Sequence, residues 1–280
     1  MLTVANRQLI ACGRTAEVYA WDNSTVLKLF FDWLPSEFIE REAYAASIIA
    51  TYPVPSAKFI GTLSVSNRRG LIFERVDGPS MVALMSSKPW LLSRQALLFA
   101  NLHFLVHSQP GDGLPQLKTV IREAINKAQS LTPELRAFAL QVLDSLPDGH
   151  SLCHCDFHPE QIVMTATGPR ILDWMSACQG DPMADVARTS VLFVLGHIPS
   201  QLSFFTRTFI YIARGPFHRR YLKEYLRLNR KADLETVKRW MIPLSAARLY
   251  ENIPGDAGTI LPFLQRALAQ NQMEKKGDLV

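Results

Sequence analysis

The sequence predicts an α+β protein in two parts, a small N-terminal part built on an antiparallel sheet and a larger, mainly helical C-terminal part. Short apolar runs divided by turn residues fill residues 1–77, a pattern typical of strands. Over residues 78–280, apolar side chains recur mainly at the i, i+3, i+4 spacing of helices. A third observation, a polar hairpin within residues 154–174, marks the place in the second part where chemistry is expected.

The composition indicates a folded protein without a membrane span or a disulfide framework. Of the 280 residues, 48% are hydrophobic, which is enough to bury a core in one large domain or in two lobes. The apolar runs are too short to span a bilayer. The four cysteines, Cys12, Cys153, Cys155 and Cys178, are too few and too unevenly spaced for a disulfide framework. We therefore expect a cytoplasmic protein without a membrane span, as a monomer or a weak homodimer.

The N-terminal part is predicted to contain a helix that is inserted after the third of five strands. This helix begins with Ser36 as its N-cap and ends before Pro53, because proline cannot continue a helix. Residues 74–79 contain turn-forming residues and indicate a linker to the second part. The strands are expected at residues 8–11, 18–21, 26–30, 58–60 and 70–74.

The C-terminal part is predicted to be a set of helices around the hairpin. Asp181 directly precedes Pro182, which favours a turn or a helix cap at this position. Helices are expected at residues 93–106, 118–130, 133–146, 185–195 and 202–213.

The hairpin brings two carboxylates and an amide into one short stretch. Gln161 opens the apolar run 162–164, and after a turn the chain returns through residues 170–172 to Asp173. Antiparallel pairing of these runs places Gln161 beside Asp173 at the open end, with Asp156 in the preceding loop. Carboxylate and amide oxygens are the hard ligands that Mg²⁺ prefers. The hairpin therefore indicates chemistry on phosphates.

The stretch from His154 to Trp174 resembles the His-Gly-Asp-x-His-x-x-Asn and Ile-Asp-Trp signature of the aminoglycoside phosphotransferase and choline kinase-like family. The resemblance implies a two-lobe protein kinase-like fold, with ATP and Mg²⁺ as cofactors. Cys155 replaces the usual glycine, a departure we interpret as mild because protein kinases carry a large side chain at the corresponding place. Gln161 replaces the usual asparagine and carries its amide on a longer stem, so the metal site could be kept, weakened or lost.

The resemblance also implies roles for the residues of the hairpin and of the helix that follows it. Asp156 would be the catalytic base that accepts or orients the proton of the attacking hydroxyl. Asp173 and Gln161 would hold Mg²⁺. His154 and Asp185 would support the catalytic loop without reacting themselves.

In the N-terminal part, the resemblance gives Lys28 and Glu42 a joint role. Lys28 would bind the α and β phosphates of ATP, and Glu42 on the following helix would keep the lysine in place. Glu40 is the rival partner, but it lies two residues away on the helix and faces elsewhere. The other nucleotide-binding positions implied by the resemblance are Gly13, Arg14 and Thr15 in the loop between the first two strands, and Glu74 and Val76 at the linker.

Two further features have structural interpretations. Cys153, His154, Cys155 and His158 could be read as a metal cluster, but their spacing is not that of a structural zinc site, and Cys153 is expected in the core. His103 resembles a family histidine, yet a lone helix histidine is more often a hydrogen-bonded core residue, so it is left out of the site.

A basic segment accounts for more than the whole excess charge of the chain. The net charge is +5, whereas residues 207–239 contain ten Lys or Arg against three Asp or Glu, formally +7. This pattern indicates a solvated helix surface or an anionic partner. No nucleic-acid motif is recognisable, so a small anionic substrate ranks above nucleic acid. Aminoglycosides are polycations that favour acidic pockets, so we expect a neutral or anionic acceptor.

The sequence therefore predicts a phosphotransferase that moves the γ-phosphate of ATP to a hydroxyl of a small molecule. One alternative is a catalytically weak or inactive kinase-like protein that binds nucleotide and regulates, motivated by Gln161 and by a phosphate loop with one glycine. A second alternative is a basic interaction module for nucleic acid or membrane.

Overall fold

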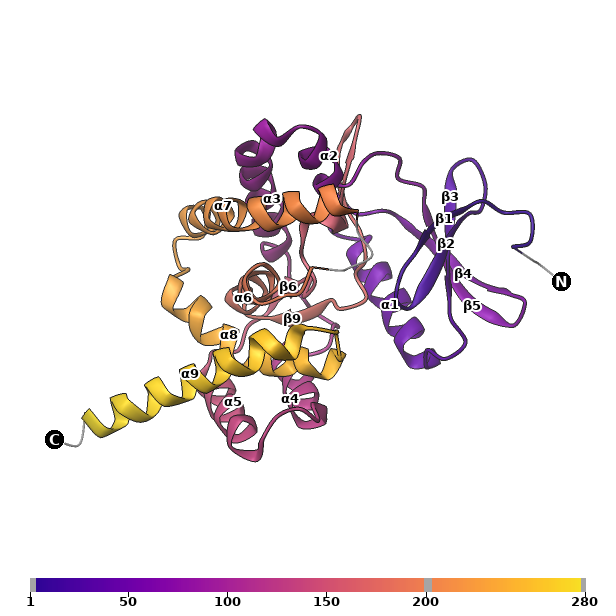
Figure 1. Cartoon of the computed structure of the whole chain (residues 1–280). Helices are drawn as coiled ribbons and strands as arrows, with labels where there is room; N and C mark the ends of the chain where they lie inside the picture. The colour runs from indigo at the N-terminus through magenta and orange to yellow at the C-terminus, as the bar shows by residue number, and fades with distance from the viewer. Residues whose placement is uncertain (1–3, 199–202, 278–280) are drawn as a thin grey trace. The chain divides into compact units, whose positions relative to one another are not determined.

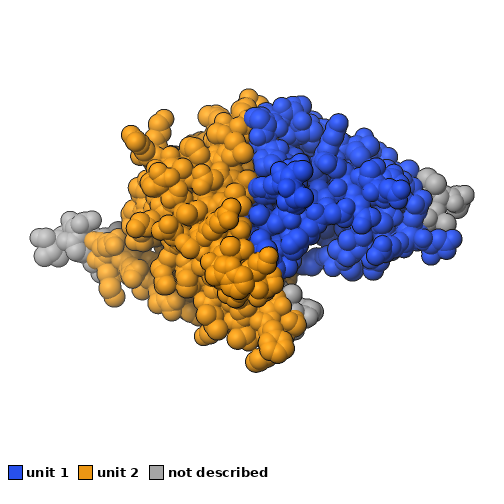
Figure 2. Space-filling view, turned by 90° about the horizontal axis from the view of Figure 1, so that it is seen from above, with its two compact units in different colours: residues 1–84, 159–177 blue, residues 85–158, 178–280 orange. Residues whose placement is uncertain are grey.

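The computed structural model describes residues 4–198 and 203–277. The chain divides into two compact units, as Figure 2 shows: unit 1 comprises Met1–Leu84 and Pro159–Ala177, and unit 2 comprises Met85–His158 and Cys178–Val280. A five-stranded antiparallel sheet lies in unit 1 and most helices lie in unit 2, which confirms the α+β class. The hairpin belongs by its contacts to unit 1, whereas the predicted functional boundary at residues 77 and 78 stays a prediction.

The sheet of unit 1 contains all five strands expected in the N-terminal part. Neighbouring strands follow the order β1-β2-β3-β5-β4 and pair antiparallel throughout, side by side in Figure 1. Their bounds are β1 (Leu9–Cys12), β2 (Ala16–Ala20), β3 (Thr25–Phe30), β4 (Phe59–Val65) and β5 (Arg68–Glu74).

Strand β3 divides its side chains between the two faces of the sheet, as the period of two requires. Leu27 and Leu29 pack with Val65 in one apolar cluster. Phe30 packs with Ile39 of helix α1 (Ser36–Ile49) in another, so Lys28, two residues before Phe30, shares the face that α1 covers. The strand therefore presents a lysine to a helix.

The start and end of α1 differ from the prediction. The N-cap residue is Pro35 and makes no side-chain cap, while Ser36 already lies in the first turn. The helix ends at Ile49, because Thr51 and Tyr52 donate their backbone N–H groups to the carbonyls of Ile48 and Ile49, three residues back, and so tighten the chain into turns.

The predicted hairpin is confirmed as β7 (Ile162–Thr165) paired antiparallel with β8 (Gly168–Ile171). The linker holds this hairpin from one side, because the Met164 N–H donates to the Pro79 carbonyl at 2.9 Å. Gly78 makes this approach possible: a Cβ atom there would lie 2.3 Å from the Met164 oxygen. The linker and the hairpin are thus one packed piece of unit 1.

Unit 2 contains the helices expected in the C-terminal part, coloured from purple to yellow in Figure 1. The predicted cap is confirmed, since the Asp181 side chain accepts a hydrogen bond from the Met183 N–H. Residue 202, where one helix was expected to begin, lies outside the described residues. The helices are α2 (Met81–Ser87, shared with unit 1), η1 (Pro89–Leu91), α3 (Leu92–His107), α4 (Leu117–Lys127), α5 (Pro133–Ser145), α6 (Pro182–Val194), α7 (Phe204–Leu228), α8 (Leu234–Arg248), η3 (Leu249–Glu251) and α9 (Asp256–Gly277).

Aromatic side chains fill the core of unit 2. The ring of Phe99 on α3 contacts the rings of Phe157, Phe217 and Tyr221, with centroids 4.4 to 5.4 Å apart. A short antiparallel pair, β6 (Ser151–Cys153) with β9 (Cys178–Gly180), leads into the loop that carries Asp156. Among the described residues, we find no helix with the length and apolarity needed to cross a membrane.

Candidate active site

In unit 1, Lys28 joins two carboxylates. Its Nζ lies 2.6 Å from Oε1 of Glu42 and 3.0 Å from Oδ1 of Asp173. The Glu42 side chain is buried, whereas Asp173 is 40% exposed, so one carboxylate anchors the lysine and the other meets solvent. The rival Glu40 pairs instead with Arg69 at 2.6 Å, at the protein surface. The structure therefore brings together Lys28, Glu42 and Asp173 and leaves Glu40 apart.

Electrostatics keep this lysine charged. Burial by itself would lower the pKa of Lys28, but the carboxylates of Glu42 and Asp173 outweigh burial and raise the pKa above its ordinary value. An ammonium group held between two carboxylates can exchange one of them for another anion. The exposed partner, Asp173, is the one that solvent and ligands can reach.

The open end of the hairpin places Gln161 and Asp173 as expected from antiparallel pairing. The Leu172 N–H donates to the Gln161 carbonyl at 2.8 Å, so Gln161 lies opposite the residue that precedes Asp173. Asp173 has a left-handed backbone with φ 59°, which is sparsely populated outside glycine and is found at functional sites.

A divalent cation suits these two side chains. Oδ1 of Asp173 binds Lys28, and the Asp173 side chain is 40% exposed. A carboxylate and an amide at the same end of a hairpin offer hard-oxygen donors, which Mg²⁺ prefers over nitrogen or sulfur. The residues present therefore fit Mg²⁺.

In unit 2, Asp185 holds the loop before the hairpin. This carboxylate is fully buried in the first turn of α6. Its Oδ2 accepts the backbone N–H of His154 at 2.5 Å, and its Oδ1 accepts that of Cys155 at 2.9 Å. His154 in turn accepts the Asp156 N–H on Nδ1 at 3.2 Å. The backbone around Asp156 is thus fixed by two buried side chains.

Asp156 itself remains within reach of solvent, with 32% of its side chain exposed. Its Oδ2 lies 3.5 Å from Nε2 of His158. Burial alone would raise the pKa of Asp156, but the hydrogen bond and charge of His158, together with Arg188, lower it to about 2. Asp156 is therefore a carboxylate anion at neutral pH, and it can accept a hydrogen bond.

Arg188 is a residue that sequence reasoning missed. It lies three residues after Asp185 on α6, donates from Nε to the Cys155 carbonyl at 3.2 Å and pairs with Glu251. The signal was available, because residues three apart on a helix share a face and Asp185 was already assigned to the loop. The structure also places His158 against Asp156, a contact that no sequence pattern indicated.

Cys155 is a larger departure than the sequence suggested. Its φ is 62°, in the left-handed region that glycine adopts freely, whereas a side chain there costs about 1 to 2 kcal/mol. By side-chain size this replacement is mild, whereas the backbone conformation is what favours glycine at this position. Cys155 therefore stores strain next to Asp156.

The zinc interpretation of the same stretch finds no support. Within the residues that the structure describes, the spacing of a metal cluster is met by His103, His107 and Asp185. The Cys153 thiol instead donates to the carbonyls of Ser151 and Asp181 in the core, as expected for a structural cysteine.

The remaining predicted nucleotide-binding residues lie in two places in unit 1. Gly13, Arg14 and Thr15 form the connection between β1 and β2. Glu74 ends β5, where its Oε2 accepts the Lys58 N–H at 3.3 Å, and Val76 follows in the linker. Their roles toward a nucleotide stay predictions.

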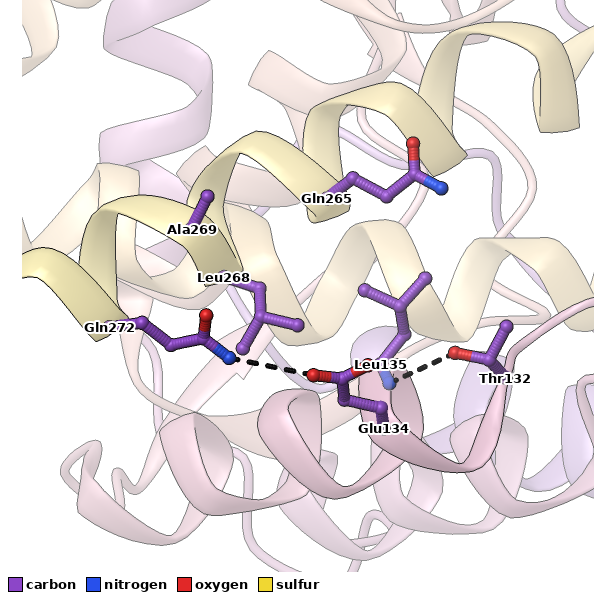
Figure 3. A pocket seen from close by; sticks show the side chains of 7 residues that line it. All are labelled: Thr132, Glu134, Leu135, Gln265, Leu268, Ala269 and Gln272. Carbon is purple, nitrogen blue, oxygen red and sulfur yellow. Dashed lines mark hydrogen bonds between the residues drawn. The ribbon is translucent and has the colours of Figure 1, made fainter.

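A pocket of about 270 Å³ lies elsewhere in unit 2, between α5 and α9. Figure 3 shows its wall, where the Gln272 amide donates to Glu134 at 3.4 Å. Thr132 caps α5 beside it by accepting the Leu135 N–H. None of the predicted site residues lines this pocket, and its one ionisable residue is already hydrogen-bonded.

Two features together are typical of the kinase-like class of folds. One is a lysine in a five-stranded antiparallel sheet that pairs with a glutamate on the neighbouring helix. The other is a buried aspartate that holds the loop of Asp156. The sequence matches the phosphotransferase enzyme family over residues 8–225, and the chain belongs to this family. No curated protein matches the chain in sequence.

Solved structures confirm the fold. An aminoglycoside-3'-phosphotransferase of type VIII has a TM-score of 0.65 at 15% identity, over 86% of this chain and 93% of that chain. A thermostable mutant of the aminoglycoside phosphotransferase APH(4)-Ia, in ternary complex with AMP-PNP and hygromycin B, has a TM-score of 0.61 at 13% identity, over 95% and 92%. Choline kinase from Cryptosporidium parvum Iowa II has a TM-score of 0.51 at 13% identity, over 97% and 89%.

Proposed function

We propose that the chain transfers the γ-phosphate of ATP to a hydroxyl of a small molecule in a reaction that requires Mg²⁺. The observation that carries this proposal is the Lys28 ammonium between buried Glu42 and exposed Asp173. Phosphoryl transfer asks a protein mainly to position groups and to neutralise charge. Buried Glu42 positions the Lys28 ammonium, and exposed Asp173 can give way to a phosphate. Lys28 is therefore placed to bind phosphate.

Unit 1 supplies the nucleotide contacts in this proposal. Lys28 binds the α and β phosphates, and Glu42 keeps its ammonium in place. Backbone groups at Gly13, Arg14 and Thr15 cover the phosphates, and the backbone from Glu74 to Val76 binds the base. Membership in the phosphotransferase enzyme family, over a range that includes all of these residues, supports the assignment.

Asp173 and Gln161 hold Mg²⁺ in this proposal. The ion, when bound, neutralises charge on the transferring phosphate. Asp173 contributes its exposed carboxylate, and Gln161 contributes its amide oxygen from the neighbouring strand end.

Asp156 acts on the acceptor. As an anion with a pKa of about 2, it accepts a hydrogen bond from the attacking hydroxyl and orients it. Such a weak base takes the proton only when the new bond between oxygen and phosphorus is largely formed. His154 and Asp185 hold the loop that carries Asp156, and they stay unreacted.

The acceptor is a neutral or anionic hydroxyl compound in this proposal. The basic segment 207–239 lies on α7 and α8, with Arg219, Arg220 and Lys223 exposed. Polycationic acceptors are disfavoured beside such a surface. Turnover of kanamycin-like compounds well above background ATP hydrolysis would contradict this part of the proposal.

Thermal unfolding in the presence of ATP, with and without Mg²⁺, tests the proposal. Ligand that binds the folded state raises Tm by mass action, and Mg²⁺ should increase the ATP-induced rise. Release of phosphate or its transfer to an acceptor should accompany the shift. A shift that Mg²⁺ does not change, with no phosphate released, would favour the catalytically weak alternative.

Two observations keep that alternative in view: Gln161 stands where the family has asparagine, and Cys155 occupies a left-handed position. The interaction-module alternative rests on the basic segment alone. Steeply salt-dependent retention on a polyanion resin, unaffected by ATP, would support it.

A further inference from the structure

A buried polar cluster lies beneath the loop that carries Asp156, in the core of unit 2. His103 and His107 are one turn apart on α3, and Tyr221 and Tyr225 are one turn apart on α7. Nδ1 of His103 lies 2.8 Å from the Tyr221 hydroxyl, and Nδ1 of His107 lies 2.6 Å from the Tyr225 hydroxyl. Two facing helices thus share a ladder of two tyrosine-histidine pairs.

The two pairs differ in how they reach Asp185. Nε2 of His107 hydrogen-bonds to Oδ2 of Asp185 at 3.2 Å. Nε2 of His103 lies 3.1 Å from the same oxygen. The contact of His107 is the one that meets the geometry of a hydrogen bond.

One arrangement of the protons satisfies both contacts of His107. Burial raises the pKa of Tyr225 well above its ordinary value, so the hydroxyl is protonated. In this arrangement the hydroxyl donates a hydrogen bond to Nδ1 of His107. The imidazole then donates from Nε2 to Asp185. Asp185 also accepts the backbone N–H groups of His154 and Cys155. A continuous chain of hydrogen bonds runs from α7 to the backbone next to Asp156.

The same contacts occupy an oxygen that a metal ion would need. His103, His107 and Asp185 have the spacing of metal ligands. However, Oδ2 of Asp185 already accepts the His154 N–H at 2.5 Å and the His107 imidazole. All three side chains are almost fully buried.

We propose that Tyr225 and His107 are positioning residues, which fix the Asp185 carboxylate and through it the backbone that presents Asp156 to the acceptor. The proposal rests on the phosphotransferase function proposed above. A buried carboxylate with two backbone donors can still rotate or tilt, whereas a third donor from a packed helix sets its orientation. Neither residue touches a reacting atom.

Tyr225→Phe tests the first residue, because it removes one hydroxyl and keeps the packed ring. We expect kcat to fall by about tenfold while KM for ATP changes less than about twofold, since a small misplacement of the loop affects chemistry and not nucleotide binding. Tyr211→Phe is the matched control. Tyr211 lies on the same helix, 70% exposed, and its variant should behave as the wild type.

Hydrogen exchange of the His154 and Cys155 amides provides a readout that needs no activity. Loss of the Tyr225 hydroxyl should speed exchange at these two amides by about tenfold, as one hydrogen bond of the chain is lost. The Tyr211→Phe protein should exchange as the wild type does. Unchanged exchange in Tyr225→Phe would overturn the proposal, whatever the activity.

His107→Gln and His107→Leu test the second residue. Glutamine can still donate an N–H toward Asp185, whereas leucine of similar volume cannot. We expect the glutamine variant to keep about fivefold more turnover and slower exchange at His154 than the leucine variant. Equal losses in both variants would show that His107 only fills space, and would overturn the proposal.

The outcomes separate this proposal from the proposed function. All variants are compared at one temperature, at which circular dichroism shows that each of them is folded. If the wild type neither binds ATP nor transfers phosphate, the proposed function fails, and the exchange rates of the Tyr225 and His107 variants still decide whether the chain of hydrogen bonds holds the loop. Turnover that is normal in the wild type and unaffected in Tyr225→Phe rejects the positioning role alone.

Discussion

The charged groups of unit 1 and the polar groups of unit 2 are held in different ways. In unit 1, Lys28 is held by ion pairs, one with buried Glu42 and one with half-exposed Asp173. In unit 2, the loop of Asp156 is held by hydrogen bonds from its own backbone to the buried Asp185 carboxylate. The first set joins charged side chains to one another, and the second fixes a backbone.

This difference suggests a division of labour. Asp173 is the exposed partner of Lys28, so the Lys28 set can release this carboxylate to a cation and take up phosphate oxygens in its place. A carboxylate that is buried and bonded to several N–H donors cannot exchange without loss of stability. Changes in unit 1 should therefore affect nucleotide binding, while changes in unit 2 should affect stability and turnover.

The largest stability effect is expected for Asp185→Asn. The amide keeps one acceptor oxygen but turns an NH₂ group toward backbone donors, so the free energy of unfolding should fall by about 3 kcal/mol. Urea unfolding followed by circular dichroism measures the change. Asp233→Asn is the control, because Asp233 is the exposed N-cap of α8 and asparagine is an equally good N-cap. Similar losses in the two variants would mean that the buried Asp185 carboxylate contributes no more stability than an ordinary helix cap.

Glu42→Gln should weaken ATP binding by about tenfold, or about 1.4 kcal/mol, because the lysine loses its buried anchor. Glu40→Gln is the matched control on α1, since Glu40 pairs with Arg69 at the surface. Its ATP affinity should stay within about twofold of the wild type. Calorimetric titration measures both. Equal effects would remove the distinction between anchor and surface pair on which the unit 1 site depends.

Cys155→Gly and Cys155→Ala together measure the backbone strain in the loop. Both lack the thiol, but only glycine accepts φ 62° without cost. The glycine variant should be more stable than the alanine variant by about 1 kcal/mol in urea unfolding. An alanine variant of equal or greater stability would show that the position carries no strain.

The smallest effect is expected at the metal. Gln161→Asn shortens the stem by one methylene and restores the amide of the family pattern, so the Mg²⁺ concentration for half-maximal turnover should fall by about threefold. ATP binding without metal should not change. A variant that loses nucleotide binding would contradict the assignment of Gln161 to the cation.

Local patterns predicted those parts of the site that depend on neighbours in sequence. The strand with Lys28, the helix with Glu42 and the hairpin with Gln161 and Asp173 follow from apolar periodicity and turn residues. The Lys28 pairing with Glu42 also needed the family resemblance, because a strand lysine and a helix glutamate are individually ordinary.

Three features were out of reach for different physical reasons. His107 and Tyr225 meet across 118 positions of sequence, and each alone is an ordinary core residue of an amphipathic helix. The left-handed backbone at Cys155 has no signal in the residue itself, since cysteine does not favour positive φ. The end of α1 at Ile49 was missed because the turns that stop it use only backbone groups.

Asp156→Asn tests the central claim, that one set of residues holds the nucleotide and the other performs the transfer. The measurement combines ATP affinity by calorimetry with Mg²⁺-dependent transfer of the γ-phosphate to a panel of neutral and anionic hydroxyl compounds. We predict that transfer falls by at least about 10²-fold, while the Kd for ATP stays within about twofold. Transfer that persists at the wild-type rate, or ATP binding that is lost together with transfer, would contradict the account.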